Sequence, residues 1–216
     1  MSDDRIILEL GRIVTLLGDG HSGIYGPRQG TPLRLVSGSL PLRFYKFADG
    51  VFVIDAVESQ RQWIGARVVR FGGMPTQDVL SALPMYIHHD NAMGVKWLGV
   101  RYTLASLAFL NAVGAIADAN RITLTLQTLD GRDHRVTVEG GSHALRFPSN
   151  LQTPPSATTV PRVLGSISTM YWQDSDPGDA RRFIALDVPV SLTSIDYFAE
   201  RDPALEAIFR LIDRGS

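Results

Sequence analysis

The stretch 65–83 constrains the fold more than any other part of this chain. Its residues 68–71, Val-Val-Arg-Phe, suit a strand that is buried on at least one face. Gly72 and Gly73 follow, and glycine accepts the positive φ that a tight reversal requires. Pro75 cannot donate a hydrogen bond to a sheet, and beyond it apolar residues recur at helical spacing. The stretch therefore predicts a strand, a tight turn and a helix.

Two pairs of segments predict β-hairpins. Residues 42–47 and 51–54 are extended in character and are separated by Asp49-Gly50, a favourable turn pair. Residues 121–127 alternate strictly between apolar and polar side chains, and residues 135–139 return after a second Asp-Gly pair. This second pair is the clearest hairpin in the sequence.

Three segments predict further helices. Near the N-terminus an apolar stripe recurs at intervals of three and four residues. Its members are Ile6, Leu10, Ile13, Val14 and Leu17. Residues 85–117 predict a helical insertion packed on the small sheet, and residues 203–213 predict an amphipathic helix. Thr76 or Asp78 is expected to cap the helix of the opening stretch.

Composition excludes several classes of function. The chain has 216 residues, 44% of them hydrophobic and 20% charged, which is ordinary for a globular protein of one large or two small domains. A net charge of −1 with scattered basic residues predicts no nucleic-acid or membrane partner. The absence of cysteine excludes disulfides, thiolate metal sites and cysteine nucleophiles. The longest apolar stretches fall short of the ~20 residues that span a bilayer.

Few motifs carry chemistry. His88, His89 and Asp90 are adjacent in sequence, but neighbouring residues diverge on a helix and no i, i+4 histidine pair is present, so a solvated helix end is predicted. The sequence has no G-x-S-x-G, S-x-x-K, H-E-x-x-H or P-loop motif. We therefore expect no metal and no cofactor.

Several segments resemble the tail-specific (C-terminal-processing) and tricorn-like serine peptidases. The stretch 65–83 resembles the strand-turn-helix pattern of their PDZ-like domain, although Ala66 replaces an acidic residue and Gly72 replaces Asn or Asp. Residues 40–53 look like the entry into that domain, and residues 16–22 resemble the L-x-D-G-H-(T/S) element of these peptidases.

The resemblance implies an α+β fold in three parts. These are an N-terminal helical segment and loop (1–38), a PDZ-like small β-sheet or barrel with a helical insertion (39–141), and a linker with a partial α/β segment (142–216). Within the last part, residues 171–172 and 182–187 resemble the first strand of the family's catalytic domain.

By the same resemblance His21 is the candidate general base of a serine peptidase. An imidazole titrates near neutrality and can accept a hydroxyl proton. A histidine that only bonds its own loop is the alternative. No nucleophilic serine element of the family is present in these residues, so enzymatic activity is left open. An unrelated enzyme that uses His21 with Asp19 is a further, weaker alternative.

The function implied is that of a non-catalytic part of a serine-type peptidase, which binds or gates extended peptide substrates. Its partners would be protein or peptide C-termini and a catalytic domain of the family. A peptide would add as a strand beside Val51, Phe52, Val53 and Ile54, opposite the helix that carries Val79 and Leu83. The alternative for the same residues is a buried core strand.

A stand-alone peptide-binding or protein-binding protein without a hydrolase domain is the alternative function. We expect a peptidase fragment to leave Ile208, Phe209 and Ile212 partly exposed, and a complete binding protein to cover them. Family members are generally exported, which implies a periplasmic or extracellular location, although residues 1–5 show no signal-peptide pattern.

Overall fold

The computed structural model describes residues 3–16, 18, 20, 38–143, 145 and 186–214. The chain divides into two compact units, Met1–Phe147 and Pro148–Ser216, which are described separately. The strand expected at 171–172 and most of 182–187 lie outside the described residues. The predicted three-part division of the chain stays a prediction.

The first unit is built on a six-stranded antiparallel sheet, which confirms the predicted α+β class. Its strand order is β1-β2-β3-β5-β6, with β4 paired to β3. The strands are β1 (Leu42–Phe47), β2 (Gly50–Ala56), β3 (Arg67–Phe71), β4 (Met74–Pro75), β5 (Arg121–Gln127) and β6 (Asp133–Glu139). The short 3₁₀ helix η1 (Glu58–Trp63) joins β2 to β3.

Both predicted hairpins are present. In the first, Phe47 pairs with Gly50, so the turn residues are Ala48 and Asp49, one position earlier than predicted. In the second, β5 and β6 pair in unbroken register from Arg121 opposite Glu139 to Gln127 opposite Asp133. The strict alternation of residues 121–127 thus corresponds to a strand with one buried face.

The opening stretch forms β3, the turn at Gly72, β4 and the helix α2 (Thr76–Ala82), as predicted. Gly72 has a φ of +56°, and its N–H donates to the Thr123 carbonyl at 3.0 Å. The predicted cap is wrong, because Pro75 occupies the N-cap position without a side-chain cap bond. The Thr76 hydroxyl instead donates to the Val68 carbonyl at 2.7 Å, tying the helix to β3.

The predicted insertion is helical. It follows the short 3₁₀ turn η2 (Leu83–Met85) and comprises α3 (Ala92–Gly94), η3 (Val95–Thr103) and α4 (Leu107–Ala112). η3 is a π-helix, and the Leu104 N–H donates to the Gly99 carbonyl at 2.8 Å across five residues. The absent side chain of Gly99 lets η3 approach Leu83 and Ile87 closely.

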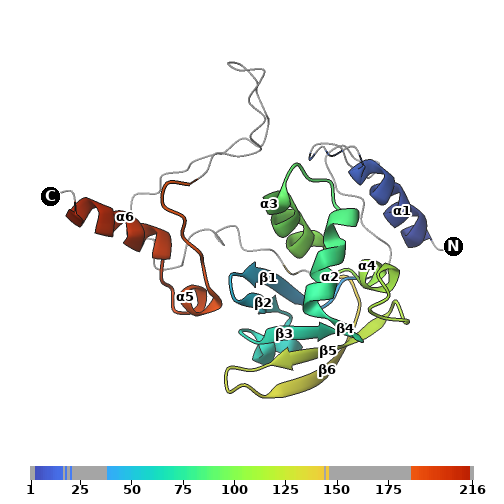
Figure 1. Ribbon diagram of the computed structural model, residues 1–216. Coiled ribbons are helices and arrows are strands. Elements are labelled where there is room, and N and C mark those ends of the chain that lie inside the picture. Colours follow the sequence, from blue (N-terminus) through green and yellow to red (C-terminus); the bar gives the residue numbers. More distant parts are fainter. Residues whose placement is uncertain are drawn as a thin grey trace, which may run out of the picture. The chain divides into compact units, whose positions relative to one another are not determined.

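The core lies between one face of the sheet and these helices. Figure 1 shows α2, α3 and α4 together above the strands, with β6 lowest in the view. Phe44 and Phe71 meet edge to face, with ring centroids 5.4 Å apart. The largest fully buried side chains also include Leu83, Leu104, Phe109, Leu110, Ile122 and Leu124.

α1 (Asp3–Thr15) packs against α4 and η2 through a different face from the predicted stripe. Leu8 is buried, whereas Ile6, Leu10 and Ile13 are 41%, 47% and 63% exposed. A hydrogen bond also joins α1 to α4, because the Arg5 guanidinium donates to the Ala112 carbonyl at 3.3 Å. The helix was predicted correctly and its buried face was not.

The described part of the second unit contains α5 (Ser194–Phe198) and α6 (Pro203–Arg214). Thr193 and Asp196 form a capping box at the start of α5. On α6, Ile208, Phe209 and Ile212 are 52%, 53% and 58% exposed. No helix among the described residues is both long and apolar enough to cross a membrane.

Candidate functional site

The predicted peptide-binding residues lie in the interior of the first unit. β2 has β1 on one side and β3 on the other. The Val53 N–H donates to the Ala66 carbonyl at 3.0 Å, and the Gly65 N–H donates to the Val53 carbonyl at 2.9 Å. A strand paired on both sides offers no edge to a peptide. Val51, Phe52, Val53, Ile54, Val79 and Leu83 are all buried, as the core-strand alternative expects.

His21 lies outside the described residues, and its role as a general base stays a prediction. The neighbouring Gly20 is described, and its N–H donates to the Asp90 carboxylate at 2.6 Å. His89 places Nδ1 2.6 Å from the Ile87 carbonyl oxygen. No group of three His, Asp or Glu side chains suited to a metal ion occurs in the described part of the chain.

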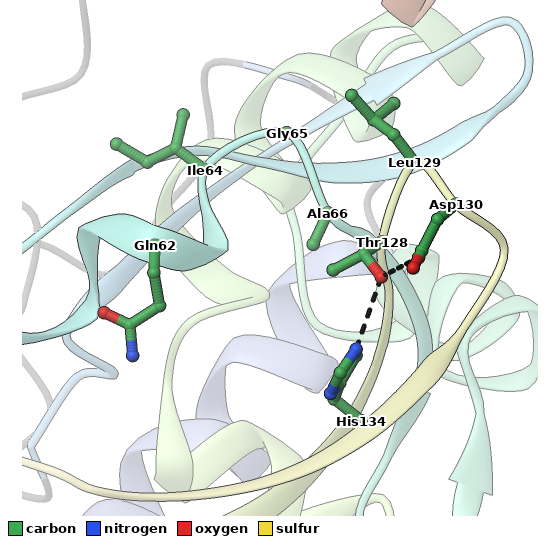
Figure 2. Close-up of a pocket in the computed structure, with 8 residues that line it drawn as sticks. All are labelled: Gln62, Ile64, Gly65, Ala66, Thr128, Leu129, Asp130 and His134. Carbon is green, nitrogen blue, oxygen red and sulfur yellow. Dashed lines mark hydrogen bonds between the residues drawn. The ribbon is translucent and has the colours of Figure 1, made fainter.

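A shallow hollow of about 430 Å³ lies between η1 and the turn of the β5–β6 hairpin. Figure 2 shows its lining, with the Thr128 hydroxyl placed between Asp130 and His134. Thr128 Oγ1 is 2.6 Å from Asp130 Oδ1 and 3.3 Å from His134 Nε2. The lining residues are Gln62, Ile64, Gly65, Ala66, Thr128, Leu129, Asp130 and His134.

This threonine, histidine and aspartate do not form a nucleophile–base pair. The single hydroxyl proton of Thr128 has its shortest acceptor in Asp130, so the contact with His134 needs a proton on Nε2. A histidine that donates to a hydroxyl cannot deprotonate it. The Thr128 hydroxyl, followed by the Arg132 N–H, lowers the pKa of Asp130. The group therefore stabilises the turn and shapes the hollow.

Among the described residues, the outer backbone edge of β6 is unpaired from Asp133 to Glu139, and directly beyond it Gly141 forms a backbone bridge with Ser39. The β5–β6 ladder ends in a backbone hydrogen bond on each side. The Gly140 N–H donates to the Asn120 carbonyl at 2.7 Å, and the Thr128 N–H donates to the Arg132 carbonyl at 3.0 Å. Since bonded and non-bonded pairs alternate in an antiparallel ladder, the backbone groups of Arg135 and Thr137 point away from β5. Within the described residues, no strand or helix pairs with this side of β6.

The sequence analysis identified β6 as a strand without identifying its edge position. The one local signal is charge, since Asp133, Arg135 and Glu139 put charged side chains at alternate positions. Natural proteins often place charges on exposed edge strands, where they discourage pairing with other chains. The hollow was also missed, because η1 and the hairpin turn that line it are far apart in sequence.

Solved structures of CPAF, a chlamydial serine protease, are similar to part of this chain. Mature CPAF complexed with lactacystin is 22% identical, with a TM-score of 0.46. Mature CPAF itself is 21% identical, with a TM-score of 0.42. In both cases the match covers 63% of this chain and 24% of the CPAF chain. A likeness this weak carries neither an activity nor a site over to this chain.

No protein-family model matches this chain, and no curated protein matches it. The resemblance to tail-specific and tricorn-like peptidases therefore stays a prediction from the sequence.

Proposed function

We propose that the part of the chain from residue 39 to residue 141 binds extended peptides, which add to the sheet as a strand beside β6. The open outer edge of β6 is the observation that supports this proposal. In strand addition, backbone hydrogen bonds supply affinity and pockets for alternate side chains supply selectivity. Protein or peptide C-termini are the proposed partners, as the sequence resemblance implies.

The hollow beside the start of β6 suits a side chain of such a peptide. Its volume of about 430 Å³ falls within the usual range for ligand pockets, and Ile64 and Leu129 give it apolar walls. Side chains of an added strand alternate between the two faces of the sheet. Those on the same face as His134 would reach the hollow. Each backbone bond to Arg135 or Thr137 would contribute about 0.5–1.5 kcal/mol.

The biological setting that the sequence resemblance supports is a serine-type peptidase, in which this module would bind or gate extended substrates. A stand-alone peptide-binding protein is the second setting. Both use the same edge of β6, so peptide binding is the property to test first.

The first experiment selects binders from a phage-displayed library of random linear peptides. Each selected peptide is then synthesised in two forms, N-methylated at odd or at even positions. An added strand turns every second amide toward β6, so one form should lose binding and the other should keep it. Failure to select any peptide, or equal loss from both forms, would contradict strand addition.

A matched pair of variants locates the peptide on β6. Arg135→Pro removes an outward N–H and leaves the bonds to β5 intact, whereas Arg135→Ala removes the same side chain and keeps that N–H. We expect the proline variant alone to lose binding, with both variants folded by circular dichroism. Peptides with a free or an amidated C-terminus then test whether a terminal carboxylate is needed.

A further inference from the structure

A second hollow, of about 400 Å³, lies toward the other end of β6. Its polar side chains are Asp118, Arg121, Thr123 and Thr137, and the rest of its lining is glycine, alanine and isoleucine. We call it the Thr137 hollow, and we call the hollow beside the start of β6 the His134 hollow. Each hollow therefore includes one side chain of β6.

The two hollows lie on opposite faces of the sheet. Side chains alternate along a strand, so His134 shares the face of the buried Val138, whereas Thr137 lies on the other face. Thr137 Oγ1 is 2.8 Å from Oγ1 of Thr123 on the neighbouring strand, so both hydroxyls lie on that second face. A strand added beside β6 would alternate in the same way. Its side chains opposite His134 and Thr137, three residues apart, would therefore point toward different hollows.

Only a long peptide side chain would enter either hollow. Neighbouring strands lie about 4.8 Å apart, so the side chain must extend past His134 or Thr137 to reach the rest of the lining. Both residues belong to the run Asp133–Glu139, whose outer edge is unpaired among the described residues. The bridge between Ser39 and Gly141 lies directly beyond this run. Both hollows thus fall within the stretch of β6 that a peptide could pair with.

The His134 hollow suits an apolar side chain. Ile64 and Leu129 line it, and Leu129 is 92% exposed at the tip of the hairpin. The Asp130 carboxylate in the same hollow accepts bonds from the Thr128 hydroxyl and the Arg132 N–H. The Arg132 guanidinium also lies 3.3 Å from it and balances its charge. The hollow therefore offers a ligand apolar contacts and no net charge.

The Thr137 hollow offers both donors and an acceptor. The bond between Thr123 and Thr137 uses one of the two hydroxyl protons, so the other proton can be donated to a ligand. Arg121 Nε is 3.1 Å from Asp118 Oδ2, and in the described part of the chain this guanidinium forms no other hydrogen bond. The ion pair is neutral as a whole. A primary amide matches this lining, because its oxygen accepts from the hydroxyl or guanidinium and its NH₂ donates to the Asp118 carboxylate.

We propose that the peptides bound beside β6 carry a long apolar residue and a glutamine three positions apart, which enter the His134 hollow and the Thr137 hollow. This proposal rests on the peptide binding proposed at β6 and specifies which peptides bind there. Anchors two or four positions apart would point to the same face and could not fill both hollows. The order of the anchors depends on whether the peptide runs parallel or antiparallel to β6, and their spacing does not.

The test starts from peptides that the phage selection and the N-methyl comparison have shown to pair with β6. Each is scanned with alanine, and its binding to the full chain is measured by fluorescence anisotropy. We expect two sensitive positions three apart, one long and apolar and the other glutamine. Replacing that glutamine by glutamate or methionine should weaken binding about three- to ten-fold, through repulsion from Asp118 or through unpaired donors.

The possible failures are distinguishable. Peptides that pair with β6 but show an even anchor spacing, a single anchor or none would overturn this inference and leave strand addition standing. Equal loss of binding from both N-methylated forms, or no selected peptide, would overturn strand addition and this inference together.

A matched pair of variants tests the glutamine anchor. Thr137→Val removes a hydroxyl from the Thr137 hollow, whereas Thr125→Val removes one from the same face of β5 outside it. We expect Thr137→Val alone to weaken binding of the glutamine peptide, about three- to ten-fold, and to leave binding of its methionine analogue unchanged. Equal effects of the two variants, or equal effects on the two peptides, would overturn the proposal.

A second matched pair tests the apolar anchor. Leu129→Gln removes an apolar wall of the His134 hollow, and Leu16→Gln makes the same change at a leucine of similar exposure outside it, 84% against 92%. We expect Leu129→Gln alone to weaken binding of the selected peptide and to leave unchanged the binding of the form with alanine at the apolar anchor. Unchanged binding of the selected peptide to Leu129→Gln would overturn the proposal.

Discussion

The two outer strands of the sheet, β1 and β6, differ in what lies beside them. β1 is flanked by η3, which contacts it from a distant part of the sequence. β6 pairs with β5 through a short turn, and its other side is open within the described part of the chain. Exposed edges invite pairing with other chains. One edge strand therefore lies against a helix, whereas the other carries charged side chains at alternate positions.

The two edges also contribute differently to the core. β1 supplies Leu42 and Phe44, which are 0% and 1% exposed, whereas β6 supplies only Val138 as a fully buried apolar residue. A strand with little buried surface can change its pairing at low cost to the fold. This difference means that the binding proposed at β6 would disturb the core less than a change at β1 would.

The largest expected effect comes from the buried face of β1. Phe44→Ala should lower the free energy of unfolding by about 3–5 kcal/mol, because it removes a ring packed on Phe71. Val138→Ala on β6 should cost only about 1–2 kcal/mol, from fewer buried methyl groups. Urea unfolding of both variants measures the difference. Equal losses would contradict the contrast between the two edges.

The cover of β1 is tested at Gly99. A side chain at this position would begin 2.7 Å from Ile87 Cδ1 and 3.0 Å from Leu83 Cδ1. Gly99→Leu should therefore push η3 outward and destabilise the protein by about 1–3 kcal/mol. Hydrogen exchange should then speed up in η3 and remain unchanged in β6. Unaltered stability would mean that η3 does not pack as described.

The open edge is tested by proline substitution at successive positions of β6. Arg135→Pro should cost less than about 1 kcal/mol, because the N–H it removes points outward. Val136→Pro should cost several times more, because Val136 belongs to a hydrogen-bonded pair with Leu124. Thermal unfolding compares the two variants. If Arg135→Pro destabilised the protein more than Val136→Pro, the outward backbone groups of β6 would have been assigned to the wrong residues.

The smallest expected effect is a pH dependence at Lys96, a half-buried lysine of η3. The pKa of Lys96 is lowered in the folded protein, so the unfolded chain binds more protons between that value and the usual lysine pKa. Stability should therefore rise with pH across that window, and the cost of charging Lys96 should be fully present at neutral pH. Urea midpoints of wild type and Lys96→Gln should converge as the pH is raised toward 10. A constant difference would contradict the prediction.

Local patterns in the sequence determined much of the secondary structure. Strict alternation in residues 121–127 and the turn glycines around Gly72 were sufficient to predict β5 and the β3–α2 connection. Both patterns involve residues that are close in sequence, so they can be recognised without knowledge of the rest of the fold. The insertion was likewise recognised as helical from its spacing.

Only the tertiary structure decided which face of each helix or strand is buried and which elements lie beside it. Strand order left β2 inside the sheet and β6 at its edge, and no local pattern of β2 distinguishes an inner strand from an edge. α1 buried Leu8 in place of the predicted stripe, since its partner α4 arrives from a distant part of the chain. The π-helix shows the same limit, because its packing beside β1 involves residues far apart in sequence. Periodicity specifies a strand or helix, whereas long-range contacts select its neighbours.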